Sequence, residues 1–416
     1  MKGDKRRQGM PLQPGQDVKL LRKAFKFRLK TTPEIENRMF QFAGCNRFVW
    51  NFALALQKES LDKTKKMLSY FQLCKCLTQW KKEDNTAFLA IAPVSCLQQT
   101  LMALDRAMFD AFDKKQPAKR FPVWKKKFKS VDSFRYPAGI KLQGGRIYLP
   151  KLGWVRFHKS REIQGTVRNM TVSRKGEHWF VSIQTQQEVL IPPRPVSNPD
   201  SDVVGIDVGI ARFVTTSTGE AVNPLNSFKR LEKKMARAQK LLARKKKFSN
   251  NWKKQKRVVS KIHIKIADAR NDFLQKKSTI LSKKHAIVVA EDLSIKNMSA
   301  SARGDMEEPG KNVKAKAGLN RSILDQGWGN FFRMIEYKQE WSGGSFLQVD
   351  PKNTSRTCPC CDQVSIDNRK TQVLFLCITC GFSANADYVG AVNIRSRGIE
   401  ELTAAGHAVA ACGGRA

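Results

Sequence analysis

The stretch Val203-Val204-Gly205-Ile206-Asp207-Val208-Gly209 places one carboxylate inside a run that is otherwise apolar. Its short length and its valine and isoleucine content predict a buried strand, with residues 213–217 as a hairpin partner. A carboxylate inside a buried strand costs free energy unless an opposite charge compensates it. A metal ion bound at Asp207 is the simplest such compensation.

Two further acids occupy comparable positions downstream. Glu291 follows the apolar run 286–290, and Asp387 stands near the start of an expected helix. Three carboxylates from two strands and one helix could hold two divalent cations roughly 3.5–4 Å apart, as in sites that cleave phosphodiesters. Magnesium, or manganese in its place, suits such oxygen ligands. Taken singly, Asp387 could instead cap its helix, and Glu291 could be an exposed acid at a strand end.

The last quarter of the chain contains two cysteine pairs, Cys358-Pro359-Cys360-Cys361 and Cys377-Ile378-Thr379-Cys380. Two pairs with this gap predict two turns that present four thiolates to one zinc ion, and a closed set of four indicates a structural site. The expected zinc ligands are Cys358, Cys361, Cys377 and Cys380, which leaves Cys360 over. The other cysteines are scattered along the chain. We expect them to be small core residues, in a protein that is located in a reducing compartment.

The composition is strongly basic, with 76 lysines and arginines against 36 acids and a formal net charge of +40. Phosphate backbones are the commonest partners for such an excess, because each contact releases condensed counterions. An anionic membrane surface is the alternative, but no apolar stretch has the length of a spanning helix. Hydrophobic residues still make up 41% of the chain. The composition therefore predicts a folded protein that binds nucleic acid.

Two segments concentrate the positive charge. Residues 228–284 predict a basic helical hairpin that turns near Ser249, and a duplex backbone is its expected partner. Residues 119–128 alternate basic and aromatic side chains, which fits phosphate contacts and base stacking, although core packing of the aromatics explains the same pattern. The expected nucleic-acid contacts in the two segments are Lys119, Arg120, Trp124, Lys125, Arg244, Lys245 and Lys246.

The expected elements give a multidomain α+β fold. Residues 20–30 and 114–195 predict the strands of a small β-barrel, which ends in a proline-containing linker at 191–195. Residues 31–113 predict an inserted helical block that begins with Thr32 as cap. Its helices are expected near residues 31–56, 70–80 and 94–112.

The second half, residues 196–349 and 384–400, predicts buried strands and helices on either side of the cysteine-rich segment 350–383. Residues 300–320 are expected to form a charged, mobile loop. Residues 1–19 and 401–416 are expected to be flexible tails.

Several of these motifs together resemble the TnpB family of insertion-sequence proteins, which is related to miniature type V CRISPR effectors. The resemblance extends from about residue 24 to residue 406, and residues 48–51 and 149–155 look like the family's first helix and barrel. The motifs that carry it are Gly205-Ile206-Asp207-Val208-Gly209, Ala290-Glu291-Asp292-Leu293, Gly327-Trp328-Gly329, Thr354-Ser355, Asn385-Ala386-Asp387 and Asn393-Ile394.

The resemblance implies a wedge-like barrel with an inserted recognition domain, then a split RuvC-like nuclease domain of RNase H fold with a zinc ribbon. It implies a guide RNA from the element's own end, a double-stranded DNA target with a short adjacent motif, and cleavage of that DNA. Asp207, Glu291 and Asp387 fall on the three RuvC acids. Gln98 or Gln99 lies on a helix that resembles the one that reads the adjacent motif.

The sequence departs from the family pattern at three points. Asn385 stands where many relatives have an acid, Arg356 stands where a glutamine is common, and Cys360 is additional. All three acids are retained, which disfavours a repressor that binds DNA without cutting it. The residues also leave open a compact type V CRISPR effector and a transposase that needs no RNA.

The cysteine pairs lie between the second and third acids, with Cys380 shortly before Asp387. This position predicts that the zinc ribbon positions the Asp387 segment beside the nucleic-acid channel. The protein is expected in the prokaryotic cytoplasm without membrane contact, and nothing in the sequence indicates a protein partner.

Overall fold

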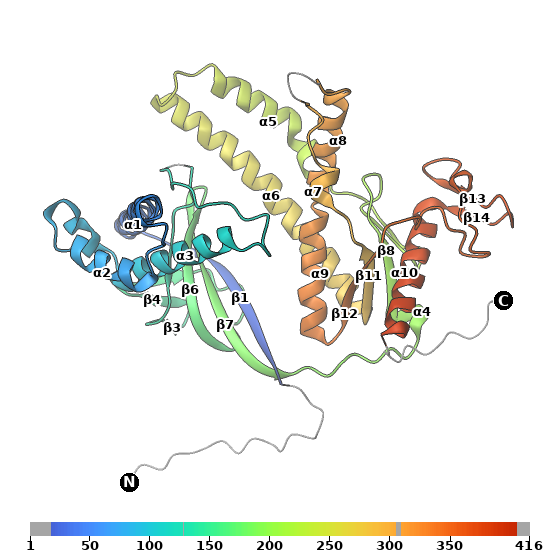
Figure 1. Cartoon of the computed structure of the whole chain (residues 1–416), viewed down its shortest axis with the longest axis horizontal. Helices are drawn as coiled ribbons and strands as arrows, with labels where there is room; N and C mark the ends of the chain where they lie inside the picture. Colours follow the sequence, from blue (N-terminus) through green and yellow to red (C-terminus); the bar gives the residue numbers. More distant parts are fainter. Residues whose placement is uncertain (1–17, 128, 305–308, 406–416) are drawn as a thin grey trace, which may run out of the picture. The chain divides into compact units, whose positions relative to one another are not determined.

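The computed structural model of the chain describes residues 18–127, 129–304 and 309–405 (Figure 1). These residues form two compact units, Val18–Val189 and the described residues from Leu190 onward. The division falls beside the segment 191–195 that the sequence predicts as a linker. The predicted N-terminal tail lies outside the described residues, apart from Val18 and Lys19, which begin the first strand.

The Val18–Val189 unit contains one seven-stranded sheet with the order β2-β6-β7-β1-β5-β4-β3. In β1 the apolar residues Phe25, Phe27 and Leu29 are buried, and the basic residues between them are exposed. Because side chains alternate between the two faces of a strand, these apolar residues lie on its inner face. Within the described pairings β2 and β3 are edges, so the predicted barrel is not closed. The strands are β1 (Val18–Lys30), β2 (Ser133–Tyr136), β3 (Lys141–Gln143), β4 (Arg146–Leu149), β5 (Gly153–Phe157), β6 (Thr166–Lys175) and β7 (His178–Leu190).

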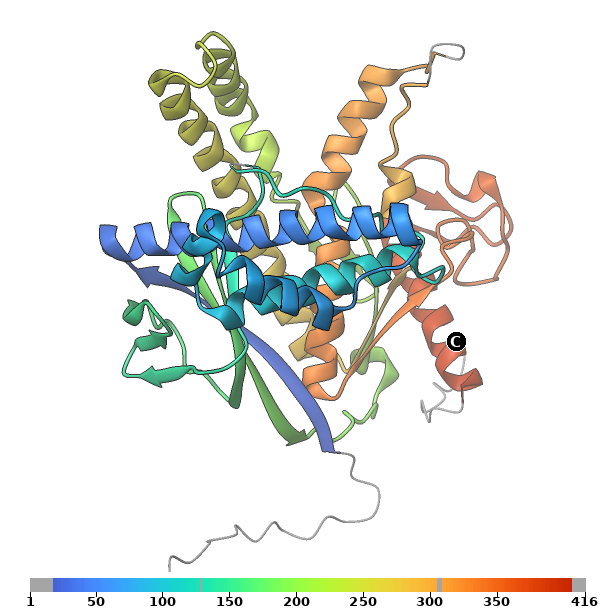
Figure 2. The same ribbon diagram turned by 60° about the vertical axis from the view of Figure 1, so that its left-hand side comes forward.

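The helices of this unit share one hydrophobic core with the sheet. They are α1 (Pro33–Thr64), α2 (Tyr70–Trp80), the 3-10 helix η1 (Asp84–Ile91) and α3 (Val94–Phe112). The first begins where predicted, because the Thr32 hydroxyl accepts a hydrogen bond from the Ile35 backbone N–H and Pro33 is the first helical residue. Figure 2 shows α1 and α3 side by side. By length and composition no single described helix could cross a membrane, whereas η1 and α3, bent by 104°, pass that test only as a pair.

The other unit is built on a five-stranded sheet with the order β10-β9-β8-β11-β12. The three strands β8, β11 and β12 are parallel, and β9 and β10 continue the sheet as an antiparallel hairpin. Their bounds are β8 (Val203–Asp207), β9 (Val214–Thr216), β10 (Ala221–Val222), β11 (Ile287–Glu291) and β12 (Ser345–Val349).

Helices cover both faces of this sheet, which explains why its central strands are continuous apolar runs. On one face Val204 and Ile206 pack with Phe331 of α9 (Trp328–Ser342). On the other face Val203 packs with Ile394 of α10 (Ala386–Ala404). The approach of α10 requires Gly205, since a Cβ atom there would come 2.1 Å from the Ala391 carbonyl oxygen.

A long helical hairpin projects from this unit, as the sequence predicts (Figure 1). It consists of α5 (Ser227–Ala243) and α6 (Asn250–Lys284), with Ser249 capping the second helix. The prediction of a loop over residues 300–320 is wrong in its last part, because α8 (Val313–Gln326) begins there, while 305–308 lie outside the described residues. The short helices are α4 (Pro199–Asp202) and α7 (Ile295–Met298).

The cysteine-rich segment contains the 3-10 helix η2 (Ile366–Asn368) and a two-stranded sheet of β13 (Leu374–Leu376) and β14 (Ser383–Asn385). The helix α10 follows β14 directly and continues to Ala404, past the point where a tail was expected to begin. Residues 406–416 of that predicted tail lie outside the described residues.

Candidate metal centres and nucleic-acid surfaces

Asp207 and Glu291 lie at the carboxyl ends of neighbouring parallel strands. The strands β8 and β11 pair with Ile206 opposite Ala290, so the next residue of each carries its carboxylate at the same edge of the sheet. Ligand sites in sheets covered on both faces form at these carboxyl ends. The register therefore brings the two acids together.

Asp387 reaches the same place from α10. Asn385 caps this helix, because its Oδ1 accepts hydrogen bonds from the backbone N–H groups of Asp387 (3.1 Å) and Tyr388 (3.4 Å). Asp387 itself is in the first helical turn and is not the cap. A Cβ atom added at Gly390 would lie 3.3 Å from Asp207 Oδ2, so α10 lies directly against the first acid.

Burial and neighbouring charges both oppose ionisation of Asp207. Burial, together with the negative charges of Glu291 and Asp387, raises the pKa of Asp207 to about 7. Burial also raises the pKa of Glu291, against a hydrogen bond from Thr354 that lowers it. Acids whose pKa values are raised in this way mark a place that a cation would stabilise.

The donor set fits divalent cations that prefer oxygen. All three side chains offer carboxylate oxygens, and no softer ligand is among them. Among the described residues only the four cysteines bring three or more ligand atoms within 4.8 Å of one another, so the acids form a more open group. An open group can accommodate two cations about 3.5–4 Å apart with room for substrate oxygens.

Thr354 holds Glu291 in place. Its hydroxyl donates a hydrogen bond to Glu291 Oε1 at 2.5 Å, and its backbone carbonyl accepts one from Asn393 Nδ2 at 2.7 Å. Asn393 is buried on α10 and also donates to the Thr357 carbonyl at 2.8 Å. The second acid is therefore oriented by a residue that is itself fixed by the helix carrying the third acid.

Arg369 places a positive charge near the acids. Its charge lowers the pKa of Asp207 against the effect of burial. On Glu291 it acts in the same direction, after the larger effect of Arg397. It follows Asn368, a buried residue that donates to the Gln363 carbonyl in the first cysteine turn and accepts from the Ile378 N–H in the second. No local pattern identifies Arg369 from the sequence, since it is one loop arginine among 76 basic residues.

The four cysteines form a compact cluster. The Sγ–Sγ distances are 3.6 Å between Cys358 and Cys380 and 3.5 Å between Cys361 and Cys377. A disulfide would need about 2.05 Å, whereas thiolates about 2.3 Å from a zinc ion lie roughly 3.8 Å apart. The spacing therefore fits a zinc ion and not two disulfides. The additional Cys360 is exposed and outside this group.

The cysteine cluster is built into the segment that carries Asp387. The hairpin of β13 and β14 encloses the second cysteine turn, and β14 leads directly into α10. Cys358, Phe375 and Cys377 share a small core with Ala386 at the start of α10. Loss of the cluster would therefore loosen the first turn of that helix.

The predicted contacts of the helical hairpin lie at its tip. Arg244, Lys245 and Lys246 are exposed in the connection between α5 and α6. Apolar side chains between the two helices hold the hairpin together, and the buried ones are Met235, Ala238, Ile262 and Ile266. The basic tip is therefore not needed for the packing of the hairpin.

The predicted contacts in residues 119–125 are more varied. Lys119 and Arg120 are exposed, and Lys119 forms an ion pair with Asp110 at 3.6 Å. Trp124 is 42% exposed, and the Lys58 ammonium lies 5.2 Å from its ring centroid. One face of this indole is therefore already occupied.

Lys125 is partly engaged inside the fold. Its Nζ lies 3.6 Å from the centroid of the Trp50 ring, and burial lowers the pKa of Lys125 to about 8. The Asn51 side chain forms two hydrogen bonds with the backbone of Lys125. This segment is therefore tied to α1.

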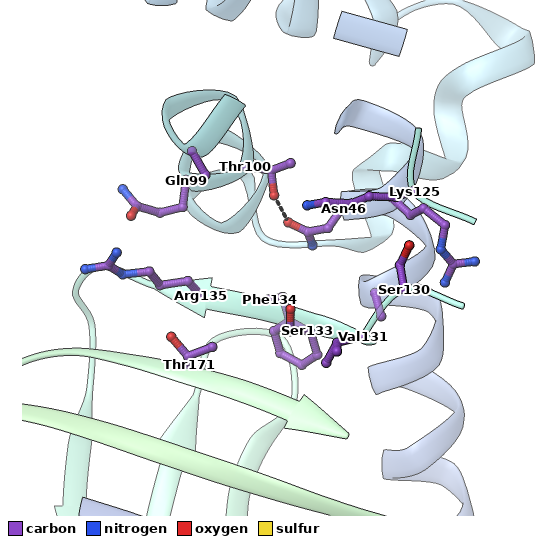
Figure 3. Close-up of a pocket in the computed structure, with 13 residues that line it drawn as sticks. Asn46, Gln99, Thr100, Lys125, Ser130, Val131, Ser133, Phe134, Arg135 and Thr171 are labelled. Atoms are coloured by element: carbon purple, nitrogen blue, oxygen red, sulfur yellow. Dashed lines mark hydrogen bonds between the residues drawn. The ribbon is translucent and has the colours of Figure 1, made fainter. Parts of the chain in front are cut away.

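Gln99 lines a cavity of about 190 Å³ in the Val18–Val189 unit. Figure 3 shows Gln99 of α3 and Arg135 of β2 on one side of this cavity and Lys125 on the other. Between them, Thr100 donates a hydrogen bond to Asn46 Oδ1. The neighbouring Gln98 is not among the lining residues. The cavity is smaller than the pockets that hold drug-sized ligands, about 300–1,000 Å³.

One solved structure has the same fold class. The cryo-EM structure of the Cas12f1–sgRNA–target DNA complex aligns with a TM-score of 0.54 and 15% sequence identity, over 90% of this chain and 99% of that chain. Both are mixed α+β multidomain proteins, which confirms the predicted fold class at this level.

Three sequence families match successive parts of the chain. Their descriptions are helix-turn-helix domain of OrfB (IS605) for residues 21–66, probable transposase OrfB (IS605) for residues 181–302, and Cas12f1-like TNB domain for residues 328–394. In this structure the first of these segments is β1 followed by α1.

Two full-length relatives establish the family. InsQ of Escherichia coli (strain K12), which carries the name of an RNA-guided DNA endonuclease, is 46% identical over 392 residues and 94% of each chain. A protein of Streptomyces pristinaespiralis with the same activity in its name is 32% identical over 399 residues, 94% of this chain and 91% of that one. The chain belongs to the OrfB family of IS605-type elements, the TnpB family, as the motifs predict.

Proposed function

We propose that this chain is an RNA-guided DNA endonuclease, which binds a guide RNA derived from its own element, recognises a short motif beside the target and cleaves the DNA by hydrolysis. The observation that carries the proposal is the meeting of Asp207, Glu291 and Asp387 at one edge of a sheet. Its family supports the same conclusion, since the two full-length relatives carry this activity in their names.

The three acids are assigned as ligands of two magnesium or manganese ions. When bound there, the ions supply an activated water and stabilise the leaving oxygen of the phosphodiester. The remaining work belongs to the chain itself. Thr354 holds Glu291 in one orientation, and Arg369 offers a positive charge that attracts the phosphate towards the acids.

The parts of the chain are assigned separate roles. Residues 20–30 and 114–195 form the wedge-like part, residues 31–113 the recognition part, and residues 196–349 with 384–400 the RuvC-like nuclease. Residues 350–383 form a ribbon around one structural zinc ion held by the cysteine cluster. Gln99 and the cavity beside it are assigned to the motif next to the target.

Nucleic acid would be held mainly through charge. Base pairing between guide and target supplies sequence specificity, while basic side chains hold the heteroduplex by its backbone. The exposed tip at Arg244, Lys245 and Lys246 and the pair Lys119 and Arg120 are assigned to such contacts. The site of action is the prokaryotic cytoplasm, at the DNA.

Two competing functions predict different products. An RNA-guided repressor would bind the target and leave it intact, which the retained acids disfavour. A compact type V CRISPR effector would cut DNA with an RNA from a CRISPR array instead of one from the element.

Sequencing of the small RNA that copurifies with the full-length protein tests the guide requirement and its source. We expect one dominant RNA species that maps to the end of the element encoding the protein. A complex assembled with an RNA altered in its target-matching segment should cut the newly matched plasmid and spare the original. A mixture of unrelated cellular RNAs, or cutting that ignores the RNA sequence, would contradict the proposal.

A further inference from the structure

We infer that the exposed face of β4 and β5 binds unpaired nucleotides of the guide RNA by stacking a base on Trp154 and Tyr148; the identity of the RNA rests on the proposed function. This platform, defined as Tyr148, Trp154 and the cations Arg146, Arg156 and Lys30 around them, lies in the Val18–Val189 unit and has no part in the metal centres described above.

Two aromatic rings lie next to each other on this face. Tyr148 and Trp154 are directly opposite in the register of β4 and β5, and their ring centroids are 5.6 Å apart. Their strand neighbours Ile147 and Val155 are buried on the inner face, so the two rings stand on the outer one. Trp154 remains 42% exposed, although a large apolar ring gains free energy from burial. The Arg146 guanidinium lies 5.9 Å from the Trp154 ring centroid, and the Lys141 ammonium lies 6.0 Å from the Tyr148 ring centroid. Each ring therefore has a cation of its own beside it, and the exposed remainder of the indole is open to a ligand.

Three cations form a row beside these rings. Arg156 of β5 is directly opposite Arg146 of β4 on one side and Lys30 of β1 on the other. Like charges that face each other across strands destabilise a sheet. Within the described part of the chain, no ion pair involves any of the three. The row therefore lacks an anion that the fold itself could supply.

The two rings and the row of cations occupy every second position of their strands. Arg146 precedes Tyr148 on β4 by two residues, and Trp154 precedes Arg156 on β5 by two residues, so rings and cations share one face. Their backbone positions are about 6.8 Å apart along each strand. Proteins that bind single-stranded nucleic acid combine a track of cations for the backbone with aromatic side chains for the bases. A duplex covers its base faces, so an unpaired nucleotide is the ligand that this pattern fits.

The persistence of the charge row favours RNA over the DNA target as occupant. The repulsion between Lys30, Arg156 and Arg146 is present whenever the chain is folded, and a target DNA strand is present only during encounters. A guide RNA is resident, and structured RNA exposes unpaired bases in loops and bulges that stack on aromatic rings. The resident anion can compensate the row throughout the life of the complex.

Ultraviolet crosslinking of the intact copurified complex locates the contact. Trypsin releases Tyr148 in the peptide 147–151 and Trp154 in the peptide 152–156, so each can be identified separately by mass spectrometry. We expect a ribonucleotide on at least one of these peptides and none on the peptide containing Phe71, an exposed aromatic residue of α2 that lies beside Tyr70. If the peptides 147–151 and 152–156 carry deoxynucleotides, and only after target DNA is added, the assignment to RNA is wrong. If neither peptide is crosslinked to any nucleotide, the platform is not a binding site.

Affinity measurements separate stacking from charge. The probe is the RNA extracted from the complex, end-labelled and titrated into RNA-stripped, full-length protein. Trp154→Leu should weaken binding by about 5- to 100-fold without changing its salt dependence, because one base no longer stacks. Trp154→Phe should recover most of the affinity. Arg156→Gln should instead reduce the slope of log affinity against log salt by about 0.7.

Phe71→Leu is the control variant, and circular dichroism checks that each variant is folded. Phe71→Leu should bind RNA like the wild type. Circular dichroism should show the wild-type thermal midpoint for Phe71→Leu and the two Trp154 variants, and an equal or higher midpoint for Arg156→Gln, which relieves the repulsion in the row of cations. Wild-type affinity in a folded Trp154→Leu protein would refute the platform and leave the proposed nuclease untouched. Loss of DNA cleavage in Asp207→Ala with unchanged RNA affinity separates the two conclusions.

Discussion

The carboxyl group of Asp207 lies where burial and two other acids oppose its charge, and its pKa is raised to about 7. The same arrangement that makes the charged group costly in the metal-free protein makes it a good cation ligand, because a divalent ion offsets both the desolvation and the repulsion. Stability and function should therefore respond in opposite directions when this one side chain is neutralised.

Neutralising Asp207 is expected to stabilise the metal-free protein at alkaline pH. In the unfolded chain the carboxyl releases its proton near pH 3.8, and in the folded chain only near pH 7, so wild-type stability falls as pH rises through this window. Asp207→Asn lacks this loss, which amounts to about 1.4 kcal/mol per pKa unit. Urea unfolding in magnesium-free buffer should show the variant more stable at pH 8 and equal to the wild type at pH 4.

Magnesium provides the control for that measurement. It should stabilise the wild type at pH 8 and have little effect on Asp207→Asn, because only the folded wild type offers the site. Equal urea midpoints for the two proteins at pH 8 without magnesium would show that the buried carboxyl is not destabilising.

Removal of the Thr354 hydroxyl should impair the metal centre without removing a ligand. Thr354→Val is expected to lose about 10- to 100-fold in metal affinity or cleavage rate, because Glu291 would no longer be held. Thr354→Ser keeps the hydroxyl and should retain most of the activity. The magnesium dependence of cleavage checks this, and a valine variant that needs no more magnesium than the wild type would argue against an orienting role.

For single residues, the sequence predicts those site residues that stand out from their immediate neighbours in the chain. Asp207 stands out because the residues around it are apolar, and the cysteine pairs stand out because their spacing is regular. Arg369 and the hydroxyl of Thr354 meet the acids only through tertiary folding. Whether Asp387 caps its helix also needed the structure, since Asn385 and Asp387 are both suitable helix caps by residue type.

Among the elements, the cysteine cluster has the clearest consequence for the metal centre, because its core includes the first turn of α10. Cys377→Ser should lose zinc, lower the thermal stability of the ribbon and reduce DNA cleavage. Zinc content by mass spectrometry and cleavage by the same preparation check this. A zinc-free variant that cleaves at the wild-type rate would show that the ribbon does not position Asp387.

The tip of the α5–α6 hairpin should contribute to binding through charge alone. Replacement of Arg244, Lys245 and Lys246 by glutamine should lower nucleic-acid affinity and reduce the salt slope by about 0.7–0.9 for each phosphate that is no longer neutralised. Lys276→Gln is the matched control, since this α6 lysine is exposed but already paired with Asp272 at 2.8 Å. An unchanged slope in the triple variant would exclude the tip from the interface.

Helices and strands with a strong hydrophobic periodicity were predicted well. Those that depend on contacts with segments distant in the sequence were not. The helices α2 and α3 show their period locally, and each lies where the sequence places it. The strand β2 is short and becomes a strand by pairing with β6. The helix α8 follows a glycine-containing, charged stretch and is fixed at its far end, where Asp325 accepts hydrogen bonds from the Phe228 N–H and Arg270.

At the scale of the whole molecule, the predicted α+β class and the TnpB family are confirmed, while the division of labour between the parts stays a prediction. Composition predicts a nucleic-acid partner because a net charge of +40 needs an anion. It cannot predict the path of the RNA or DNA, because that path depends on surfaces assembled from distant segments. The open strand order in place of the predicted barrel has the same origin, since ring closure is a property of the assembled sheet and not of any strand.

Cleavage of a target plasmid by the purified ribonucleoprotein in magnesium, compared between wild type and Asp207→Asn with matched RNA content, tests whether the three acids form a nuclease site. We expect the wild type to cut a plasmid that matches the RNA. The variant should bind that plasmid and cut it at least about 100-fold more slowly, because the electrostatic stabilisation of the reacting phosphate is removed. Cutting by Asp207→Asn at the wild-type rate would contradict the assignment of Asp207 as a catalytic acid.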